Sequence, residues 1–575
     1  MKIKHLFGLA VIAAMAASCS SNEDLGTAGP GTGEAGVGYA TFTINLPSVS
    51  GTRAADAGGA EVDPGTEDEY KVSDATALIF QKYGEDEGSY KFVESVNLPV
   101  TGAWEDAEEG VTKSKKLVAK LTNVDTKNTY GVLVLLNNNI TGGGVKIALP
   151  TAGLSYKKWN DNILNPDLAE LAKTGEFYMA NAPLNKAGKV TTLVTIDKDK
   201  IYSSKEKAER GTAADVYVER GVAKMTVADP GTKTVMDKAT SVSTKSQVTF
   251  SNWALDITNK KTFAVHNIDG LSNDFPAIWT TEDRFTGINN RVYWGKDPNY
   301  DKTELNTADE TNDTKRKEEF NFIDATSKID KDFGETNPVY CLENTFNLAN
   351  MYQGQTTRVI FKAKYAPMND AGVSLAETDG TFYTIGNMKT ILKEDKLKEA
   401  VNAAATSVLP GCTVNYANLE TEGSHVITLE DIKDGTSGAV LEAAKKYGTG
   451  LKTGDEIVAE INTKLGLKAG RPEEMVGINT YKEGVTYYIA RVKHFGSLTD
   501  WHSGESYGGN NKQYLGRYGM LRNNWYELQV GNVYGPGYPG VPPVDPTLPD
   551  DENEKYLSVS VKILSWAKRS DTVDL

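Results

Sequence analysis

Residues 556–575 read YLSVSVKILSWAKRSDTVDL, and they end the chain with an alternating apolar pattern at Val559, Val561 and Ile563. A period of two is typical of a strand with one buried face. The 21 residues before it, Gly535–Lys555, contain six prolines and end in a run rich in acidic residues. Such a run is expected to bury no core and to stay extended. A strand on an extended tether can fold back onto its own domain or reach a neighbouring molecule.

The chain of 575 residues is too long for one hydrophobic core and is expected to form at least two domains. Its 39% hydrophobic and 24% charged residues are ordinary for a soluble globular protein. The 54 glycines and 27 tyrosines favour β structure rich in turns. A formal charge of −15 argues against a nucleic-acid partner, because binding phosphates requires a basic face.

Residues 1–19 have the features of an export signal: two early lysines, an apolar run over Leu6–Ala17 too short to span a membrane, and small residues before Cys19. The ending Ala16-Ala17-Ser18-Cys19 resembles a lipobox, in which the cysteine is lipidated and becomes the first residue of the mature chain. The alternative is an ordinary signal peptide with an unmodified cysteine. A lipid on Cys19 is the expected membrane anchor, because no other window holds 18 uninterrupted apolar residues.

A second alternating stretch, Tyr39–Leu46, follows a spacer of small and polar residues. Its apolar face is made by Ala40, Phe42, Ile44 and Leu46. The strand stops at Pro47, and a loop of small residues then carries Arg53, the only basic residue between Lys4 and Lys71. An isolated arginine on such a loop is an available substrate for an arginine-specific protease, although, taken alone, Arg53 is more simply interpreted as an ordinary loop residue.

The rest of the chain is predicted to be rich in strands, with helices inserted late and without a regular β-α-β alternation. The predicted strands are Ala75–Tyr83, Lys116–Leu121, Tyr130–Leu136, a strand pair over Ala214–Val227, Gln247–Ile257, Val339–Leu342, Thr357–Tyr365 and Val485–Val492. A period of 3.6 predicts helices over Leu397–Val408 and Ile457–Leu465, the second capped by Thr453 or Asp455. A short helix is expected near Pro166–Lys173, and a polar insertion over Lys296–Lys331.

No residue pattern indicates catalysis, a metal site or a cofactor. The five histidines form no metal-binding motif, and His494 and His502 are interpreted as polar loop residues. The spacing G-x-G-x-x-G at Gly535–Gly540 lacks the strand and helix of a dinucleotide site. Lys315–Glu319 is interpreted as solvated surface. Cys341 and Cys412 could form a disulfide, but two cysteines make no framework and are interpreted as buried apolar residues.

Several short stretches, in this order, resemble the minor-fimbrium (Mfa-type) fimbrilins, the subunits of Bacteroidales-type type V pili. Cys19, the strand at Ala40–Leu46 and Arg53 stand where fimbrilins carry their leader, prosegment strand and processing site. The later stretches are Glu176–Asn181, Val218–Lys224, Phe250–Leu255, Tyr340–Thr345, Arg522–Val530 and Val559–Leu575. The polar insertion at Lys296–Lys331 departs from the family pattern.

The resemblance implies a mainly β protein with two β-sandwich-like domains, transthyretin-like and of Greek-key topology, and a few inserted short helices. It implies a signal peptide at 1–19, a propeptide at 20–53, β domains at 54–230 and 231–534, a linker at 535–555 and a donor strand at 556–575. The domain boundary is also marked by Asp229-Pro230-Gly231.

The resemblance further implies a non-enzymatic pilus stalk subunit that supports adhesion. An arginine-specific protease would cut between Arg53 and Ala54 of an outer-membrane lipoprotein precursor, and Ala40–Leu46 would leave. The strand with Val559, Val561, Ile563 and Trp566 of another subunit would replace it by β-augmentation. The expected partners are further copies of the chain, anchor and tip pilins and the protease, on a cell-surface fimbrium.

A lipid-anchored adhesin that binds a glycan, and an anchor or tip pilin, remain the alternatives. The sequence names no receptor.

Overall fold

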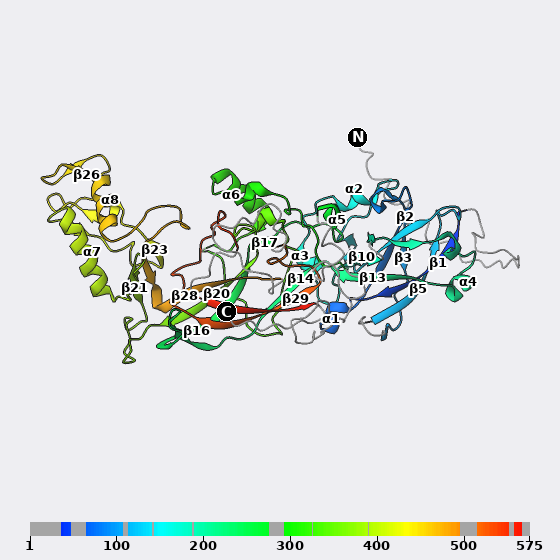
Figure 1. The fold of residues 1–575 in the computed structure, drawn as a ribbon, viewed down its shortest axis with the longest axis horizontal. Helices are drawn as coiled ribbons and strands as arrows, with labels where there is room; N and C mark the ends of the chain where they lie inside the picture. The colour runs from blue at the N-terminus through cyan, green and yellow to red at the C-terminus, as the bar shows by residue number, and fades with distance from the viewer. Residues whose placement is uncertain are drawn as a thin grey trace, which may run out of the picture.

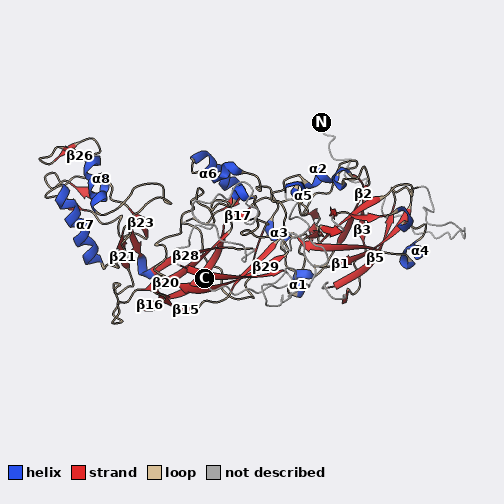
Figure 2. Cartoon of the chain, viewed as in Figure 1, coloured by secondary structure: helices blue, strands red, loops and turns tan. Residues whose placement is uncertain are grey.

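The computed structural model describes residues 36–47, 65–106, 113–140, 143–186, 189–274, 292–324, 326–388, 390–494, 515–550 and 557–565. It is elongated, with an N-terminal domain at one end, a C-terminal domain in the middle and a smaller unit at the other end (Figure 1). Strands dominate the first two parts, whereas the two longest helices lie in the third (Figure 2). The expected mainly β architecture with β-sandwich-like domains and few short helices is confirmed.

The N-terminal domain is built on one sheet path, β3-β2-β6-β9-β13-β1-β5-β4, with β12 also paired to β6. Its strands are β1 (Gly38–Asn45), β2 (Ala75–Gln81), β3 (Lys91–Leu98), β4 (Glu105–Asp106), β5 (Lys113–Leu121), β6 (Tyr130–Leu136), β9 (Met179–Asn181), β12 (Val194–Ile196) and β13 (Ala214–Arg220). Two small hairpins are added, β7 (Asn139–Ile140) with β8 (Gly144–Val145) and β10 (Leu184–Lys186) with β11 (Lys189–Thr191).

Strand β13 belongs to both layers of this domain. Residues 214–217 pair in parallel with β1, whereas residues 218–220 pair antiparallel with β9. A strand that passes from one sheet to the other makes a corner of a sandwich. The layer β13-β1-β5 thus packs across a common core from the layer β9-β6-β2-β3, in which β6 is buried along its whole length, as its unbroken apolar run predicts.

The C-terminal domain repeats this plan with the path β19-β14-β29-β15-β16-β20-β28, and β30 pairs with β29. Its strands are β14 (Ala223–Val227), β15 (Thr232–Met236), β16 (Ser243–Asp256), β19 (Val339–Cys341), β20 (Arg358–Ala366), β28 (Val485–Arg491), β29 (Asn524–Val533) and β30 (Leu557–Ser565). A short pair, β17 (Thr258–Asn259) with β18 (Phe320–Asn321), lies beside it. Here β15 and β29 join the two layers.

The two domains divide within the predicted strand pair. β13 and β14 do not pair with each other: β13 stays in the N-terminal sheet, and β14 pairs with β29 and β19 of the C-terminal sheet. The sheets therefore separate at Gly221 and Val222, ahead of the boundary expected at residue 230. A Cβ on Gly221 would lie 2.8 Å from the Tyr178 ring, so the direct passage between domains has no room for a side chain.

The third unit, which we call the helical lobe, lies between β20 and β28 and has its own core. It holds α7 (Glu394–Val408) and α8 (Gly454–Lys464) with β21 (Phe382–Ile385), β22 (Thr413–Val414), β23 (Gly423–His425), β24 (Ile432–Lys433), β25 (Lys446–Tyr447), β26 (Lys452–Thr453) and β27 (Ile478–Tyr481). Both predicted helices are confirmed, and Thr453 caps α8 with Glu456 in a capping box.

The remaining helices are short and lie at the domain surfaces. They are α1 (Glu67–Tyr70), α2 (Tyr156–Asn160), α3 (Leu168–Leu171), α4 (Lys205–Arg210), α5 (Leu271–Asp274) and α6 (Glu310–Glu319). The charge run at Lys315–Glu319 falls on α6 and is only partly solvated. Arg316 and Glu319 are buried, and Arg316 donates to the Leu305 carbonyl at 2.7 Å. Sequence alone could not show that α6 packs against the loop before it.

The two described cysteines form no disulfide with each other. Cys341 and Cys412 are free and buried in separate cores, as expected for apolar cysteines. Among the helices that the structure describes, none is long and apolar enough to cross a membrane.

The side chain of Asn181 replaces backbone pairing where β9 diverges from β6. Its amide oxygen accepts from Val134 N at 2.8 Å, and its nitrogen donates to the carbonyls of Val132 and Thr192 at 3.0 and 2.8 Å. Asn181→Ala should lower the free energy of unfolding by about 3 kcal/mol, because it leaves buried backbone groups without their hydrogen-bond partner. Urea unfolding checks this, with the exposed Asn162→Ala as the control. Equal midpoints for the two variants would contradict it.

Candidate functional site

The predicted removable strand is β1, and it occupies an interior position in the N-terminal sheet. It pairs in parallel with β13, with Phe42 opposite Ala214, and antiparallel with β5, with Phe42 opposite Leu117. Ala40, Phe42, Ile44 and Leu46 are each at most 2% exposed and belong to the domain core. β1 therefore fills a slot whose two walls are strands and whose floor is the core.

The other face of β1 is covered by α4. Thr41 is 2% exposed, and its hydroxyl donates to the Ala208 carbonyl at 2.6 Å. Thr43, by contrast, is only half-buried. The slot thus accepts large apolar side chains on one face and small or polar ones on the other.

The predicted donor strand is β30, and it lies along β29 of its own domain. Val559, Val561 and Ile563 stand opposite Val530, Leu528 and Tyr526, three residues whose side chains are buried in the C-terminal core. Leu564 stands opposite Trp525. In the described part of the chain β30 pairs with β29 alone, so it is an edge strand.

Four predicted site residues lie outside the described residues: Cys19, Arg53, Ala54 and Trp566. The chain is described up to Pro47 after β1 and again from Gly65. The segment that carries Arg53 therefore connects the end of β1 to α1.

A buried polar cluster joins the two domains directly after that segment. We call it the junction cluster; it comprises Glu69 of α1, Arg220 of β13, Lys224 of β14, Tyr340 of β19 and Trp525 of β29. Lys224 Nζ lies 2.8 Å from Glu69 Oε1 and 3.7 Å from the centre of the Trp525 ring. The Tyr340 hydroxyl donates to Glu69 Oε1 at 2.6 Å, and Arg220 Nε donates to the Glu69 carbonyl at 2.8 Å.

The groups around Glu69 favour its ionised form. Burial raises the pKa of Glu69, but Lys224, Tyr340 and Arg220 outweigh burial, so that the pKa is lowered overall. Arg220 is fully buried, and its backbone N–H donates to Asn523 Oδ1 at 3.1 Å. The cluster thus fixes α1 against both sheets. Sequence reasoning singled out Arg220 and Lys224 within a motif but missed Glu69, because its partners lie more than 150 positions away.

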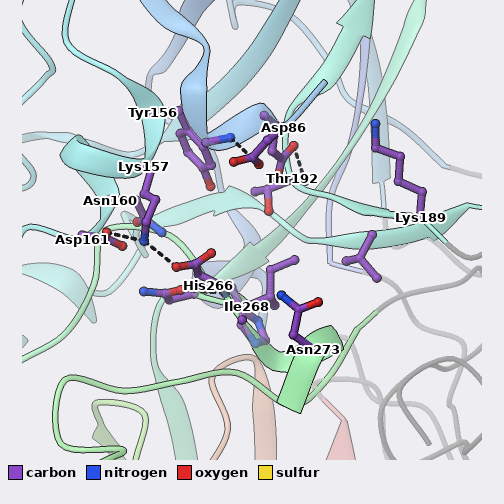
Figure 3. A pocket seen from close by; sticks show the side chains of 16 residues that line it. Asp86, Tyr156, Lys157, Asn160, Asp161, Lys189, Thr192, His266, Ile268 and Asn273 are labelled. Atoms are coloured by element: carbon purple, nitrogen blue, oxygen red, sulfur yellow. Dashed lines mark hydrogen bonds and ion pairs between the residues drawn. The ribbon is translucent and has the colours of Figure 1, made fainter. Parts of the chain in front are cut away.

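A cavity of about 380 Å³ opens between α2, β11 and the stretch around His266 (Figure 3). Its lining is mostly polar, and the groups largely pair among themselves: Lys157 bridges Asp161 and Asp269, and Asn160 accepts from Val265 N at 2.8 Å. Burial raises the pKa of Glu87, at the cavity wall, to about 7.

The described histidines form no cluster. His266 Nδ1 lies 2.8 Å from Glu219 Oε1, and its buried Nε2 has no hydrogen-bond partner among the described residues. His494 contacts the Tyr526 hydroxyl at 2.7 Å, whereas its predicted neighbour His502 lies outside the described residues. Within the described ranges, no group of three or more histidine, cysteine and acidic residues could hold a metal ion.

Part of the chain is similar to fimbrial proteins. Residues 479–572, which include β28, β29 and β30, match the model of the C-terminal part of the type IV major fimbrial subunit protein, fimbrillin. The match confirms, for this part of the chain, the resemblance that the sequence indicates. A fimbrial assembly protein from Parabacteroides distasonis aligns at 11% identity and a TM-score of 0.27, over 62% of this chain and 94% of that one. No curated protein matches the chain.

Substitution of Glu69 tests the junction cluster. Glu69→Gln should lower the free energy of unfolding by about 3 to 5 kcal/mol, because it removes the negative charge from a buried ion pair with Lys224. Since the pKa of Glu69 is lowered in the fold, its contribution is complete above about pH 4.3, the usual glutamate pKa, and is lost as the pH falls further. The difference in urea midpoint between wild type and variant should therefore shrink in acid. A difference that stays constant with pH would contradict this. Glu85→Gln, which alters an exposed pair, is the control.

Proposed function

We propose that the chain is a structural subunit of a fimbria and that it polymerises by strand exchange after proteolysis at Arg53. The observation that carries the proposal is the position of β1. This strand fills a slot between β13 and β5, yet one of its ends continues into the segment with Arg53. A cut there would leave β1 held by non-covalent contacts alone.

Loss of β1 would expose the edges of two strands and part of the core. Burial of Phe42, Ile44 and Leu46 contributes on the order of 5 to 8 kcal/mol before ordering costs. Unpaired strand edges are strong templates for another strand. The emptied slot therefore favours an incoming strand with alternating apolar residues, parallel to β13 and antiparallel to β5.

The sequence of β30 meets this requirement. Val559, Val561 and Ile563 can replace Phe42, Ile44 and Leu46, or, one pair earlier, Ala40, Phe42 and Ile44. If β30 enters in the direction of β1, Ser558 takes the place of Thr41 in the first register and Ser560 does so in the second. Either serine has the hydroxyl needed to donate to the Ala208 carbonyl as Thr41 does.

The slot and β30 belong to different domains of an elongated molecule (Figure 1). A contact between unlike surfaces of identical subunits is head-to-tail, and it builds a filament unless rotation closes a ring. The proposed partners are further copies of the chain and other pilins. The proposed precursor is an outer-membrane lipoprotein anchored through Cys19 and cut by an arginine-specific protease.

The second candidate is a surface lipoprotein that stays anchored through Cys19 and binds a small polar ligand such as a glycan. The polar cavity beside α2 favours it. Mass spectrometry of the mature N-terminus separates the two: Ala54 supports the stalk subunit, and lipidated Cys19 supports the anchored protein.

Arg53→Ala should abolish polymerisation. Purified precursor treated with an arginine-specific protease should yield an N-terminus at Ala54 and filaments in electron micrographs, whereas the variant should stay monomeric. Arg210→Ala, which removes an exposed arginine of α4, is the matched control and should assemble normally. Assembly of the Arg53 variant at the wild-type rate would rule out this cleavage as the trigger.

A disulfide that holds β30 on its own domain should block assembly. Gln529 is exposed and stands opposite Ser560, and such a pair lies about 4.5 to 5.5 Å apart between Cα atoms, within the range of a disulfide. The oxidised Gln529→Cys/Ser560→Cys variant should be cleaved but should not donate its strand, and reduction should restore filaments. Normal filaments from the oxidised variant would exclude β30 as the donor.

A further inference from the structure

The proline-rich run before β30 is docked on the C-terminal domain over its described part, residues 535–550. Prolines lack an N–H, but their carbonyls and those of their neighbours accept hydrogen bonds. The Tyr488 hydroxyl donates to Gly535 O at 2.8 Å and the Tyr481 hydroxyl to Gly537 O at 3.0 Å. Tyr487 and Tyr538 exchange two backbone hydrogen bonds of 2.9 and 2.8 Å. The run is thus a bound segment rather than the free tether that its composition predicts.

A buried arginine holds the middle of the run. Arg358 of β20 pairs with Asp256 at 2.8 Å, and both side chains are at most 3% exposed. The same guanidinium donates to Pro542 O at 2.6 Å and to Pro543 O at 3.3 Å. Removal of the run would leave these donors without acceptors inside the protein, which is costly for a charged group.

The described part of the run ends at a buried carboxylate, that of Asp550. The Asp550 side chain is fully buried; its Oδ2 accepts from the Thr356 hydroxyl at 2.5 Å, and Arg491 Nε lies 3.9 Å from its Oδ1. Asp550 N donates to Met351 O at 3.1 Å and Gln353 N to Leu548 O at 3.0 Å. Between these anchors the fit is close, since a Cβ on Gly354 would lie 2.7 Å from Pro546 Cβ.

We propose that residues 535–550 stay bound to the C-terminal domain in the filament, and that Asp550 is the fixed point from which β30 reaches the next subunit. This inference rests on the proposed strand exchange. Only six residues separate Asp550 from Leu557. The seven Cα–Cα intervals from Asp550 to Leu557, at about 3.3 Å each, span about 23 Å, against about 70 Å for a free run from Gly535 to Lys555.

The short connection between Asp550 and β30 limits where the next subunit can lie. The slot of the next subunit must lie within about 23 Å of Asp550, so neighbouring subunits are held close. A shorter link also raises the effective concentration of β30 at that slot. During assembly β30 therefore moves from β29 to the slot of the next subunit, whereas residues 535–550 keep their place on the C-terminal domain.

A second disulfide tests this inference. Tyr352 and Pro549 form an antiparallel bridge, and the hydrogen bonds on either side, Gln353 N to Leu548 O and Asp550 N to Met351 O, make it a non-hydrogen-bonded pair. Such pairs lie about 4.5 Å apart between Cα atoms, within the range of a disulfide. Replacement of Pro549 by cysteine breaks neither of these two hydrogen bonds. The natural Cys341 and Cys412 are buried and do not compete.

The oxidised Tyr352→Cys/Pro549→Cys variant should polymerise after protease treatment at the rate of its own reduced form. Failure of the oxidised form, with assembly restored by reduction, would show that the run must detach and would overturn the proposal. The disulfide between positions 529 and 560 serves as the comparator, because it should block assembly while this one should not. If that comparator assembles when oxidised, the proposal that β30 is the exchanged strand is wrong. This outcome is independent of the result at positions 352 and 549.

Hydrogen–deuterium exchange provides a measurement on the unmodified protein. Backbone amides of residues 535–550 should be equally protected in monomer and filament, within about twofold in rate. Loss of protection in the filament would overturn the proposal.

Discussion

A β-strand between two neighbours must satisfy hydrogen-bonding groups on both of its edges, and the N-terminal domain depends on β1 to do so. β1 joins β5 to β13, and β13 is the strand that turns the corner between the two layers. Without β1 the domain would lose part of its core and the ladder that connects β5 to β13. The domain is therefore dependent on whichever strand fills that slot.

The two domains form one continuous support between the slot and the C-terminal strand. β13 lines the slot and continues through Gly221 into β14, which pairs in parallel with β29, the strand that carries β30. The junction cluster fixes this route from the side, because Glu69 binds β13 through Arg220 and β14 through Lys224. Tension between the slot and the C-terminal domain would therefore pass along β13 and β14 and through the buried contacts of the junction cluster.

The sequence could predict the features that depend on local order. The alternation at Ala40–Leu46 and at Val559–Ile563, the apolar run of β6 and the cap at Thr453 each follow from residues within one element. It could not predict features made by distant partners. The parallel neighbour of β1 begins at Ala214, Glu69 meets Tyr340, and the proline-rich run finds its donors on β20 and β28. Composition describes what a segment offers, but not whether a folded surface elsewhere presents the matching groups.

The pairing counts indicate why β30 would leave its own domain for a slot in another molecule. On β29, β30 pairs through eight residues on one edge and is open on the other in the described part of the chain. In its slot β1 pairs through eight residues with β5 and through four more with β13. At about 0.5 to 1.5 kcal/mol net for each hydrogen bond, the second ladder adds a few kcal/mol in favour of the slot. While β1 is present the slot is closed, and β30 stays where it has one ladder. Under the proposed strand exchange, removal of β1 would reverse the preference without any change in β30, and a cut far from the C-terminal strand would decide where that strand binds.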